Sequence, residues 1–355
     1  MPRIRLDLAL LSMAAVLAVA PVACIGSAAA TRRAGSGVSL PASDDSGFTT
    51  YFSGDTTDAV TTPAGGALLA GGGTDSDVGM RWLLAQGGTR APRGYGDVVI
   101  LRASGSDGYN DYLAQLGANS VTSIVIRSAA GANSTFVRHA IARAEVVFLA
   151  GGDQSNYERL WRGTALQTAV NARIAQGYPV GGTSAGLAVL GEFGYSALNE
   201  SAMSATVLQD PFDASVTFER ALFTVPHLTN VITDSHFVAR DRMGRLLGFL
   251  ARLETLYGAS APRAVAVDET SAVGMDAKGS ATVFGRGEGA YFLSTRGVTT
   301  RTVAPATPLT YAPVTVLHVG VGKRFDLASW TTRDAVPYTL SASAGVVSSS
   351  TGAIY

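Results

Sequence analysis

Charged residues are scarce in this sequence, and neither sign predominates. Only 15% of its 355 residues are charged, with 27 basic and 27 acidic side chains, whereas soluble domains typically carry about 25%. The absence of a basic excess argues against a nucleic-acid-binding protein. Disorder is also disfavoured, because it requires low hydrophobicity and high net charge, and 47% of these residues are hydrophobic.

Cysteine and histidine are rare as well. Cys24 is the only cysteine, so no disulfide can form within the chain. With only four histidines besides, the sequence contains no Cys/His cluster of the kind that holds a metal ion. We therefore expect no metal and no cofactor.

The first 30 residues have the pattern of a secretory signal peptide. Arg3 and Arg5 precede an apolar run at residues 8–22, and residues 28–30 offer small side chains for cleavage. The run is shorter than the roughly 20 residues of a membrane span. Cys24 follows this run in a setting similar to the lipobox of bacterial lipoproteins, so lipidation is the alternative to plain cleavage. Either form predicts a secreted, periplasmic or cell-surface protein, with a lipid anchor as its only membrane contact.

The rest of the chain divides by composition into three parts. Residues 31–63 are rich in Ser, Thr, Gly and Asp and predict a low-complexity linker, which a short edge segment could end. Residues 64–335 form the predicted catalytic domain, and residues 336–355 a C-terminal tail.

Short apolar runs alternate with helical patterns along the predicted domain. Apolar runs of this length are typical of buried strands in a parallel sheet, and they lie at residues 66–70, 97–101, 121–126, 146–149, 179–182 and 264–267. Ser134 is expected to cap one helix. Residues 157–176 are expected to form a second helix, which ends at Gly177. Residues 271–330 predict antiparallel hairpins packed on the sheet. The expected fold is α/β, with a doubly wound, mostly parallel sheet, flanking helices and C-terminal hairpins.

The pattern Gly-x-Ser-x-Gly surrounds Ser184. A short apolar run precedes it and a helical stretch follows, which is the context of a nucleophile elbow. Gly182 and Gly186 leave room for the tight turn, and the backbone N–H of Ala185 could bind an oxyanion. The alternative is a glycine-rich turn with an incidental serine.

A nucleophilic serine needs a base, and the base needs a carboxylate that orients it. His139 in a predicted helix and His318 in the late β region suit structural roles. His227 and His236 both remain candidates for the base.

Asp268 and Glu269 directly follow a predicted strand, so either could orient the base at the carboxyl edge of the sheet. The chain order would then be serine, histidine, acid, whereas α/β-hydrolases have serine, acid, histidine. Three carboxylates that precede His236 keep an α/β-hydrolase esterase open as an alternative: Asp210, Asp213 and Asp234.

Several segments in order resemble the cyanophycinase family. They are GGDQ at residues 151–154, GGTSAG at 181–186, DSHFVARDRMGRLL at 234–247, AVAVDET at 264–270 and GRGEGAYF at 285–292. The resemblance extends from about residue 65 to 330. It implies a serine peptidase related to α-aspartyl dipeptidase, a fold like class I glutamine amidotransferases, and a homodimer. It also implies that Ser184 is the nucleophile, His236 the base and Glu269 the orienting acid.

The family cleaves cyanophycin, a polyaspartate chain with arginine joined to each side-chain carboxyl, and releases β-Asp-Arg dipeptides. Ala185 and Gly72 are the candidate oxyanion donors. The resemblance implies a substrate pocket that contains Gln154, Asp234, Arg240, Arg242 and Arg245. Ser235 stands where the family commonly has glutamine, which puts the identity of the substrate in question.

Three functions follow in order of preference. The first is a secreted exopeptidase for cyanophycin that acts through an acyl-enzyme. The second is a related peptidase for other acidic or isoaspartyl peptides, which Ser235 motivates. The third is a non-catalytic secreted binding protein on the same scaffold, for which the loss of one member of the set Ser184, His236 and Glu269 would be the signature.

Overall fold

The computed structural model describes residues 47–89 and 94–355. These residues belong to one compact unit of the chain, residues 37–355. The predicted signal peptide, Cys24 and most of the predicted linker lie outside the described residues. No described helix is both long and apolar enough to cross a bilayer.

The described helices and strands alternate through the first two thirds of the chain, and strands dominate the last third. The helices are α1 (Asp77–Gln86), α2 (Asn110–Leu116), α3 (Ala129–Ala132), α4 (Thr135–Arg143), α5 (Gln154–Trp161), α6 (Ala165–Ala175), α7 (Ala185–Ala188), α8 (Ser204–Gln209) and α9 (Met243–Tyr257). The strands are β1 (Phe48–Gly54), β2 (Ala67–Ala70), β3 (Asp97–Arg102), β4 (Ser120–Ile126), β5 (Val146–Leu149), β6 (Val180–Thr183), β7 (Phe193–Tyr195), β8 (Phe218–Arg220), β9 (Val231–Asp234), β10 (Arg263–Val267), β11 (Ser271–Met275), β12 (Ser280–Gly285), β13 (Ala290–Ser294), β14 (Thr300–Thr302), β15 (Thr310–Val319), β16 (Arg324–Asp326), β17 (Tyr338–Ser343) and β18 (Val346–Ser349).

The first sheet has a parallel centre and antiparallel edges. Its strand order is β1-β4-β3-β5-β6-β2-β11-β12-β16. The five strands from β4 to β2 run parallel, and β1, β11, β12 and β16 pair antiparallel. Strands such as β2 and β5 are buried along their whole length, because helices cover both faces of a parallel sheet.

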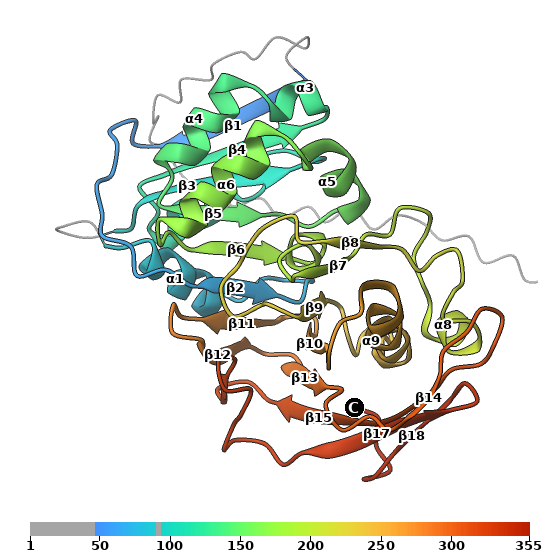
Figure 1. The fold of residues 1–355 in the computed structure, drawn as a ribbon. Helices are drawn as coiled ribbons and strands as arrows, with labels where there is room; N and C mark the ends of the chain where they lie inside the picture. Colours follow the sequence, from blue (N-terminus) through green and yellow to red (C-terminus); the bar gives the residue numbers. More distant parts are fainter. Residues whose placement is uncertain (1–46, 90–93) are drawn as a thin grey trace, which may run out of the picture. The chain divides into compact units, whose positions relative to one another are not determined.

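Two separate apolar layers show that the sheet is doubly wound. Helices α1 and α2 pack on one face through Leu83, Leu113 and their neighbours. Helices α4 and α6 pack on the other face through residues such as Ile141 and Val170, and Figure 1 shows these two helices lying across β3 and β5. The predicted α/β class is therefore confirmed.

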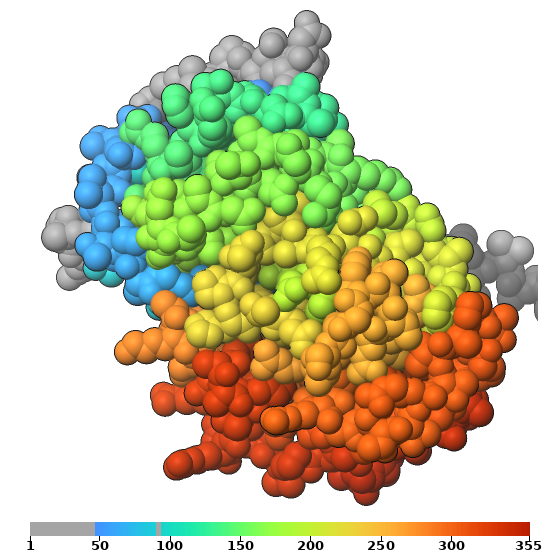
Figure 2. All heavy atoms as spheres, viewed as in Figure 1, coloured from blue at the N-terminus to red at the C-terminus, as the bar shows by residue number. Residues whose placement is uncertain are grey.

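The second sheet is largely antiparallel and lies beside α9 (Figure 1). Its order is β18-β17-β15-β13-β10-β9-β7-β8, with β14 paired to β15. Only β7, β9 and β10 run parallel in it. In the space-filling view the residues near 220–250, coloured yellow, lie between the green and the orange-red parts of the chain (Figure 2).

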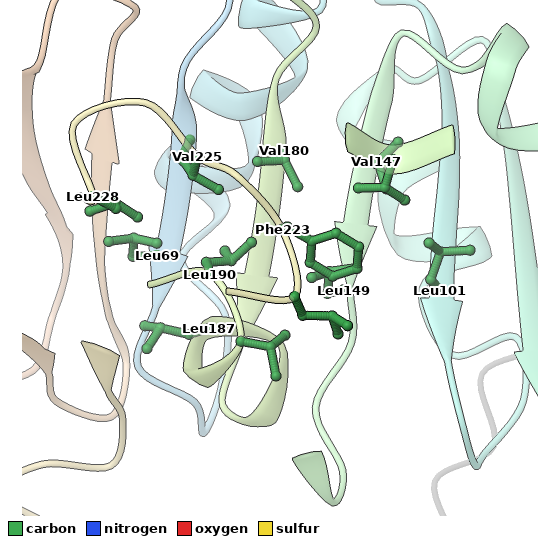
Figure 3. Close-up of a cluster of buried hydrophobic side chains, with 14 of the residues drawn as sticks. Leu69, Leu101, Val147, Leu149, Val180, Leu187, Leu190, Phe223, Val225 and Leu228 are labelled. Carbon is green, nitrogen blue, oxygen red and sulfur yellow. The ribbon is translucent and has the colours of Figure 1, made fainter. Parts of the chain in front are cut away.

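The segment after α7 closes one face of the parallel sheet. Phe223, Val225 and Leu228 come from the irregular chain between β8 and β9, and they cover side chains of β2, β5 and β6 (Figure 3). Leu187 and Leu190 join the same cluster. This packing fixes the end of β6, where Ser184 follows.

All six predicted strands are present, but their arrangement differs in part. β10 lies in the second sheet, parallel to β9, and β11, β12 and β16 extend the first sheet instead of packing on it. Within the predicted linker, residues 48–54 form β1, which pairs with β4. The predicted C-terminal tail holds β17 and β18, which pair with each other.

The single helix expected over residues 157–176 is wrong. It is divided into α5 and α6 by three residues, of which Gly163 has φ of +74°. A left-handed residue cannot continue a right-handed helix, and Thr164 is already extended as the N-cap of α6. The helix end itself is as expected: Gly177 is left-handed after α6, and the predicted cap Ser134 accepts from the Phe136 N–H.

Candidate active site

Ser184 stands on a strained turn between β6 and α7. Its backbone has φ of +53° and ψ of −114°, a conformation that costs free energy for any residue with a side chain. The Ser184 N–H donates to the Ala70 carbonyl at the end of β2. The turn therefore presents the hydroxyl at the carboxyl end of the parallel sheet, where ligands bind in this class of fold.

Backbone contacts explain the glycines on each side of this serine. A Cβ on Gly182 would lie 2.4 Å from the Gly186 carbonyl oxygen, and one on Gly186 would lie 2.1 Å from the Leu149 carbonyl oxygen. Real Cβ atoms do not approach backbone oxygens so closely. Both glycines are thus required by the close packing of the turn on β5.

His236 reaches Ser184 from the second sheet. It follows β9 and adopts φ of +47°, and its N–H donates to the Gly71 carbonyl at 2.7 Å. Its Nε2 lies 2.6 Å from Ser184 Oγ. The imidazole is nearly buried, with 9% of the side chain exposed.

Glu269 completes a hydrogen-bonded chain of three side chains. Its Oε1 lies 2.6 Å from Nδ1 of His236, which holds the Nδ1–H tautomer and leaves Nε2 as an acceptor for the serine hydroxyl. The neighbouring Asp268 points elsewhere. Its buried Oδ1 accepts from the N–H groups of Val238 and Ala239 at 2.9 and 3.0 Å. Glu269 therefore binds the imidazole of this turn, and Asp268 binds its main chain.

The surroundings of His236 favour its neutral form. Burial lowers its pKa below the ordinary value, the hydrogen bond to Glu269 opposes this, and the positive charges of Arg240 and Arg242 lower the pKa further. A base must be unprotonated to accept a proton. The imidazole is therefore in the required form at neutral pH.

The two predicted oxyanion donors both lie beside this chain of side chains. Ala185 is the first residue of α7, and the first N–H groups of a helix have no acceptor within it. Gly72 has φ of +98°, and a Cβ there would lie 2.4 Å from Cε1 of His236. Only glycine allows the backbone to approach the imidazole so closely; the donor role of Gly72 stays a prediction.

A cavity of about 390 Å³ opens next to Ser184. Its lining includes all the residues predicted to bind substrate, together with Ser184 and His236: Gln154, Asp234, Ser235, Arg240, Arg242 and Arg245. They come from the start of α5 and from the segment that runs from the last residue of β9 into the first turn of α9. Tertiary structure thus assembles one pocket from segments about 80 residues apart in sequence.

The three pocket arginines differ in what they can offer a ligand. Arg245 is buried, and its Nε and Nη2 bind both carboxylate oxygens of Asp234 at 3.0 and 2.5 Å. These two side chains neutralise each other and form the pocket floor. Arg242 donates to the Ser235 carbonyl at 2.7 Å, and burial lowers its pKa to about 10. Arg240 is 54% exposed and lies 3.9 Å from Glu269.

Known proteins share sequence patterns with this chain. Residues 106–273 match the sequence model of peptidase family S51, and the match includes Ser184, His236 and Glu269. The segment that carries the site is therefore similar to peptidase family S51. This is a family of serine peptidases, and the residue pattern around the site agrees with that chemistry.

Curated proteins similar to this chain include two that are named cyanophycinase. The one from Thermosynechococcus vestitus is 28% identical over 182 residues, which are 50% of this chain and 51% of the relative. The one from Trichormus variabilis is 26% identical over 228 residues, covering 62% and 71%. The chain thus spans about half the length of the first of them.

Two solved structures are also similar. A peptidase from an acI-B1 Actinobacterium has a TM-score of 0.47 at 13% identity, covering 74% of this chain and 97% of that chain. A putative peptidase E from Listeria monocytogenes EGD-e has a TM-score of 0.40 at 12% identity, covering 63% and 99%.

The structure separates the alternatives that the sequence left open. His227 lies elsewhere, with Nε2 on the Ala277 carbonyl, His139 is exposed on α4, and His318 stacks on Tyr291. Asp213 accepts from Ser215. Since Asp234 is occupied by Arg245, no carboxylate of the α/β-hydrolase order contacts His236 within the described residues.

Sequence reasoning missed one wall of the pocket. Residues 197–201 line it, and Tyr195 anchors them because its hydroxyl donates to the Glu200 carbonyl and accepts from the Ala202 N–H. Arg159 on α5 also lines the pocket and donates to the Leu198 carbonyl. No motif marks this loop; the only signal is its polar composition after β7. Gln154 contacts the Tyr195 carbonyl at 3.4 Å.

Proposed function

We propose that this protein is a serine peptidase that hydrolyses cyanophycin to β-Asp-Arg dipeptides. The observation that carries the proposal is the continuous chain of hydrogen bonds from Ser184 through His236 to Glu269, beside a pocket lined by several arginines. Such a chain activates a hydroxyl that is otherwise a weak nucleophile.

The proposed reaction has two halves. Ser184 Oγ attacks the scissile carbonyl carbon while its proton passes to His236 Nε2, and the carbonyl electrons move onto oxygen beside the Ala185 N–H. The carbon–nitrogen bond then breaks, and His236 gives its proton to the leaving amine. Water attacks the resulting ester, His236 accepts the proton of that water and returns it to Ser184, and the product leaves as a carboxylate.

The pocket chemistry supports an anionic substrate. Arg240 and Arg242 supply positive charge close to Ser184, and guanidinium groups bind carboxylates in a geometrically matched way. Cyanophycin presents a free carboxylate on each attached arginine. The curated relatives named cyanophycinase support the same substrate.

The test is digestion of purified cyanophycin by the full chain and by Ser184→Ala, with products read by mass spectrometry. We expect β-Asp-Arg from the parent and none from the variant, and Ser329→Ala, an exposed serine outside the pocket, should behave as the parent. Release of dipeptide by Ser184→Ala at the parent rate would refute the mechanism.

The second candidate is a peptidase for other isoaspartyl or acidic peptides. Ser235 favours it, because its short side chain leaves no amide in the pocket where the family commonly has one. If folded parent protein leaves cyanophycin intact but cleaves isoaspartyl dipeptides in a Ser184-dependent way, this candidate replaces the first. A binder without catalysis would react with neither.

We further propose that the protein is exported. The signal-peptide pattern of residues 1–30 motivates this, with Cys24 as a possible lipid attachment point. Expression in a bacterial host with a C-terminal tag and fractionation would test it: the mature mass in the medium, periplasm or membrane fraction supports export, and full-length protein in the cytoplasm contradicts it.

A further inference from the structure

The turn that carries the base contains two strained residues. His236 and Asp241 both have φ of +47°, in the left-handed region that residues with side chains adopt at a cost. Such residues persist only where neighbours hold them. The turn between them is closed by main-chain hydrogen bonds, including one from the Arg242 N–H to the Phe237 carbonyl at 2.9 Å.

The His236 end of this turn is held by the active site itself. The His236 N–H donates to the Gly71 carbonyl, and the His236 ring binds Ser184 and Glu269. Asp268 accepts from the N–H groups of Val238 and Ala239 in the same turn. None of these contacts reaches the side chain of Asp241, which lies in sequence between the pocket residues Arg240 and Arg242.

The side chain of Asp241 is held by Tyr355, which is 114 positions away, while the Asp241 main-chain carbonyl accepts from Ser204 Oγ. The Tyr355 hydroxyl donates to Asp241 Oδ1 at 2.9 Å and accepts from the Met243 N–H at 3.0 Å. Its ring packs edge-on against Phe237, with centroids 5.8 Å apart. Tyr338 on β17 fixes the preceding residue through its hydrogen bond to the Ile354 carbonyl.

We propose that Tyr355 is a positioning residue for the substrate pocket: it locks Asp241 and so holds Arg240 and Arg242 where they meet the substrate. The inference rests on the proposed function. Tyr355 touches no reacting group, so it acts through the turn. Without its hydroxyl, the Asp241 carboxylate and the Met243 N–H lose a shared partner, and the two neighbouring arginines are held less firmly.

The experiment compares Tyr355→Phe with Tyr257→Phe, which removes a phenol hydroxyl that contacts the Phe218 carbonyl outside the pocket. A small sulfonyl fluoride measures the reactivity of Ser184 alone, and the oligomer (β-Asp-Arg)₃ measures the pocket. In Tyr355→Phe we expect KM to rise about 5- to 10-fold, the effect of roughly one ordinary hydrogen bond. Sulfonylation and kcat should stay within about twofold of the parent, since His236 keeps its own anchors.

An unchanged KM in Tyr355→Phe, or a parallel fall of kcat and of the sulfonylation rate, would overturn the proposal. Hydrogen exchange of the amides at residues 238–243 gives a readout that needs no substrate. Faster exchange in Tyr355→Phe and not in Tyr257→Phe supports the positioning role, and equal exchange in both overturns it. A parent that reacts with neither reagent nor oligomer refutes the proposed function instead, and the exchange result then still decides whether Tyr355 holds the turn.

Discussion

Glu269 binds Nδ1 of His236 at 2.6 Å although 35% of its side chain is exposed, whereas only 9% of the His236 side chain is exposed. The acid thus lies at the edge of the site and the base lies inside it. The adjacent Asp268 is buried and binds only main-chain N–H groups of the same turn. Replacing Glu269 should therefore affect catalysis, whereas replacing Asp268 should affect stability.

Replacing Glu269 should impair catalysis without unfolding the protein. Glu269→Gln loses the charge that orients and stabilises the imidazolium, so we expect kcat to fall by about 10²- to 10⁴-fold, with a melting temperature close to that of the parent. Steady-state kinetics and thermal melts measure both.

Replacing Asp268 should instead cost stability. Asp268→Ala removes the acceptor of the partly exposed Val238 and Ala239 N–H groups, which we expect to cost about 0.5–1.5 kcal/mol each in the free energy of unfolding. Asp268→Asn keeps an oxygen acceptor and should recover most of this loss. Denaturant titration of both variants decides the matter, and equal stability of the two would contradict the role that we assign to Oδ1.

The rate should depend on pH through His236. Because burial and the nearby arginines lower its pKa, the unprotonated base persists below the pH at which an exposed histidine becomes protonated, and kcat/KM should fall only at lower pH. Arg240→Gln removes one of the charges that lower this pKa, so the acid limb should move to higher pH. The rate of Ser184 sulfonylation as a function of pH measures this shift without using the pocket. If the acid limb of Arg240→Gln lies at the same pH as that of the parent, Arg240 and His236 are not coupled.

The glycines of the elbow should tolerate no side chain. Gly182→Ala and Gly186→Ala place a methyl group against backbone oxygens, and overpacking of this kind costs about 1–3 kcal/mol or more. Gly108→Ala is the matched control, because a Cβ there meets nothing within 4 Å. Thermal melts should show two destabilised proteins and one that resembles the parent.

The buried pair of Asp234 and Arg245 should be necessary for the fold of the pocket. Arg245→Ala removes the closer partner of the buried Asp234 carboxylate and leaves it only Arg242, at 3.5 Å, as an ion-pair partner; we expect a loss of about 3 kcal/mol, the lower end for a broken buried pair. Arg143→Ala is the control: its pair with Asp58 is exposed on both sides, and such pairs contribute about 0–1 kcal/mol. Chemical unfolding of both variants tests the contrast. Similar losses of unfolding free energy would mean that the buried pair contributes no more to stability than the exposed pair.

The sequence by itself determined the features that depend on neighbouring residues. Apolar runs bounded by glycines predicted the strands, because burial on both faces leaves no room for polar residues. The pattern around Ser184 located the turn between β6 and α7, because a sharp strand-to-helix turn needs glycines on both sides of it. The helix break at Gly163 has no local signature, because the amphipathic pattern continues across it and a single glycine within a helix is only mildly unfavourable.

Only the tertiary structure decided which distant groups meet. His227 and His236 are equivalent as residues, and Asp268 and Glu269 are neighbours. The choice between them depends on the pairing of β9 with β10 and on the left-handed backbone of His236, which turns the ring toward Ser184. The same holds for Arg245, whose charge is cancelled by Asp234, and for Tyr355, which meets the turn of the base. Side-chain partners across long separations follow from how the two sheets pack, and that packing has no local signature in the chain.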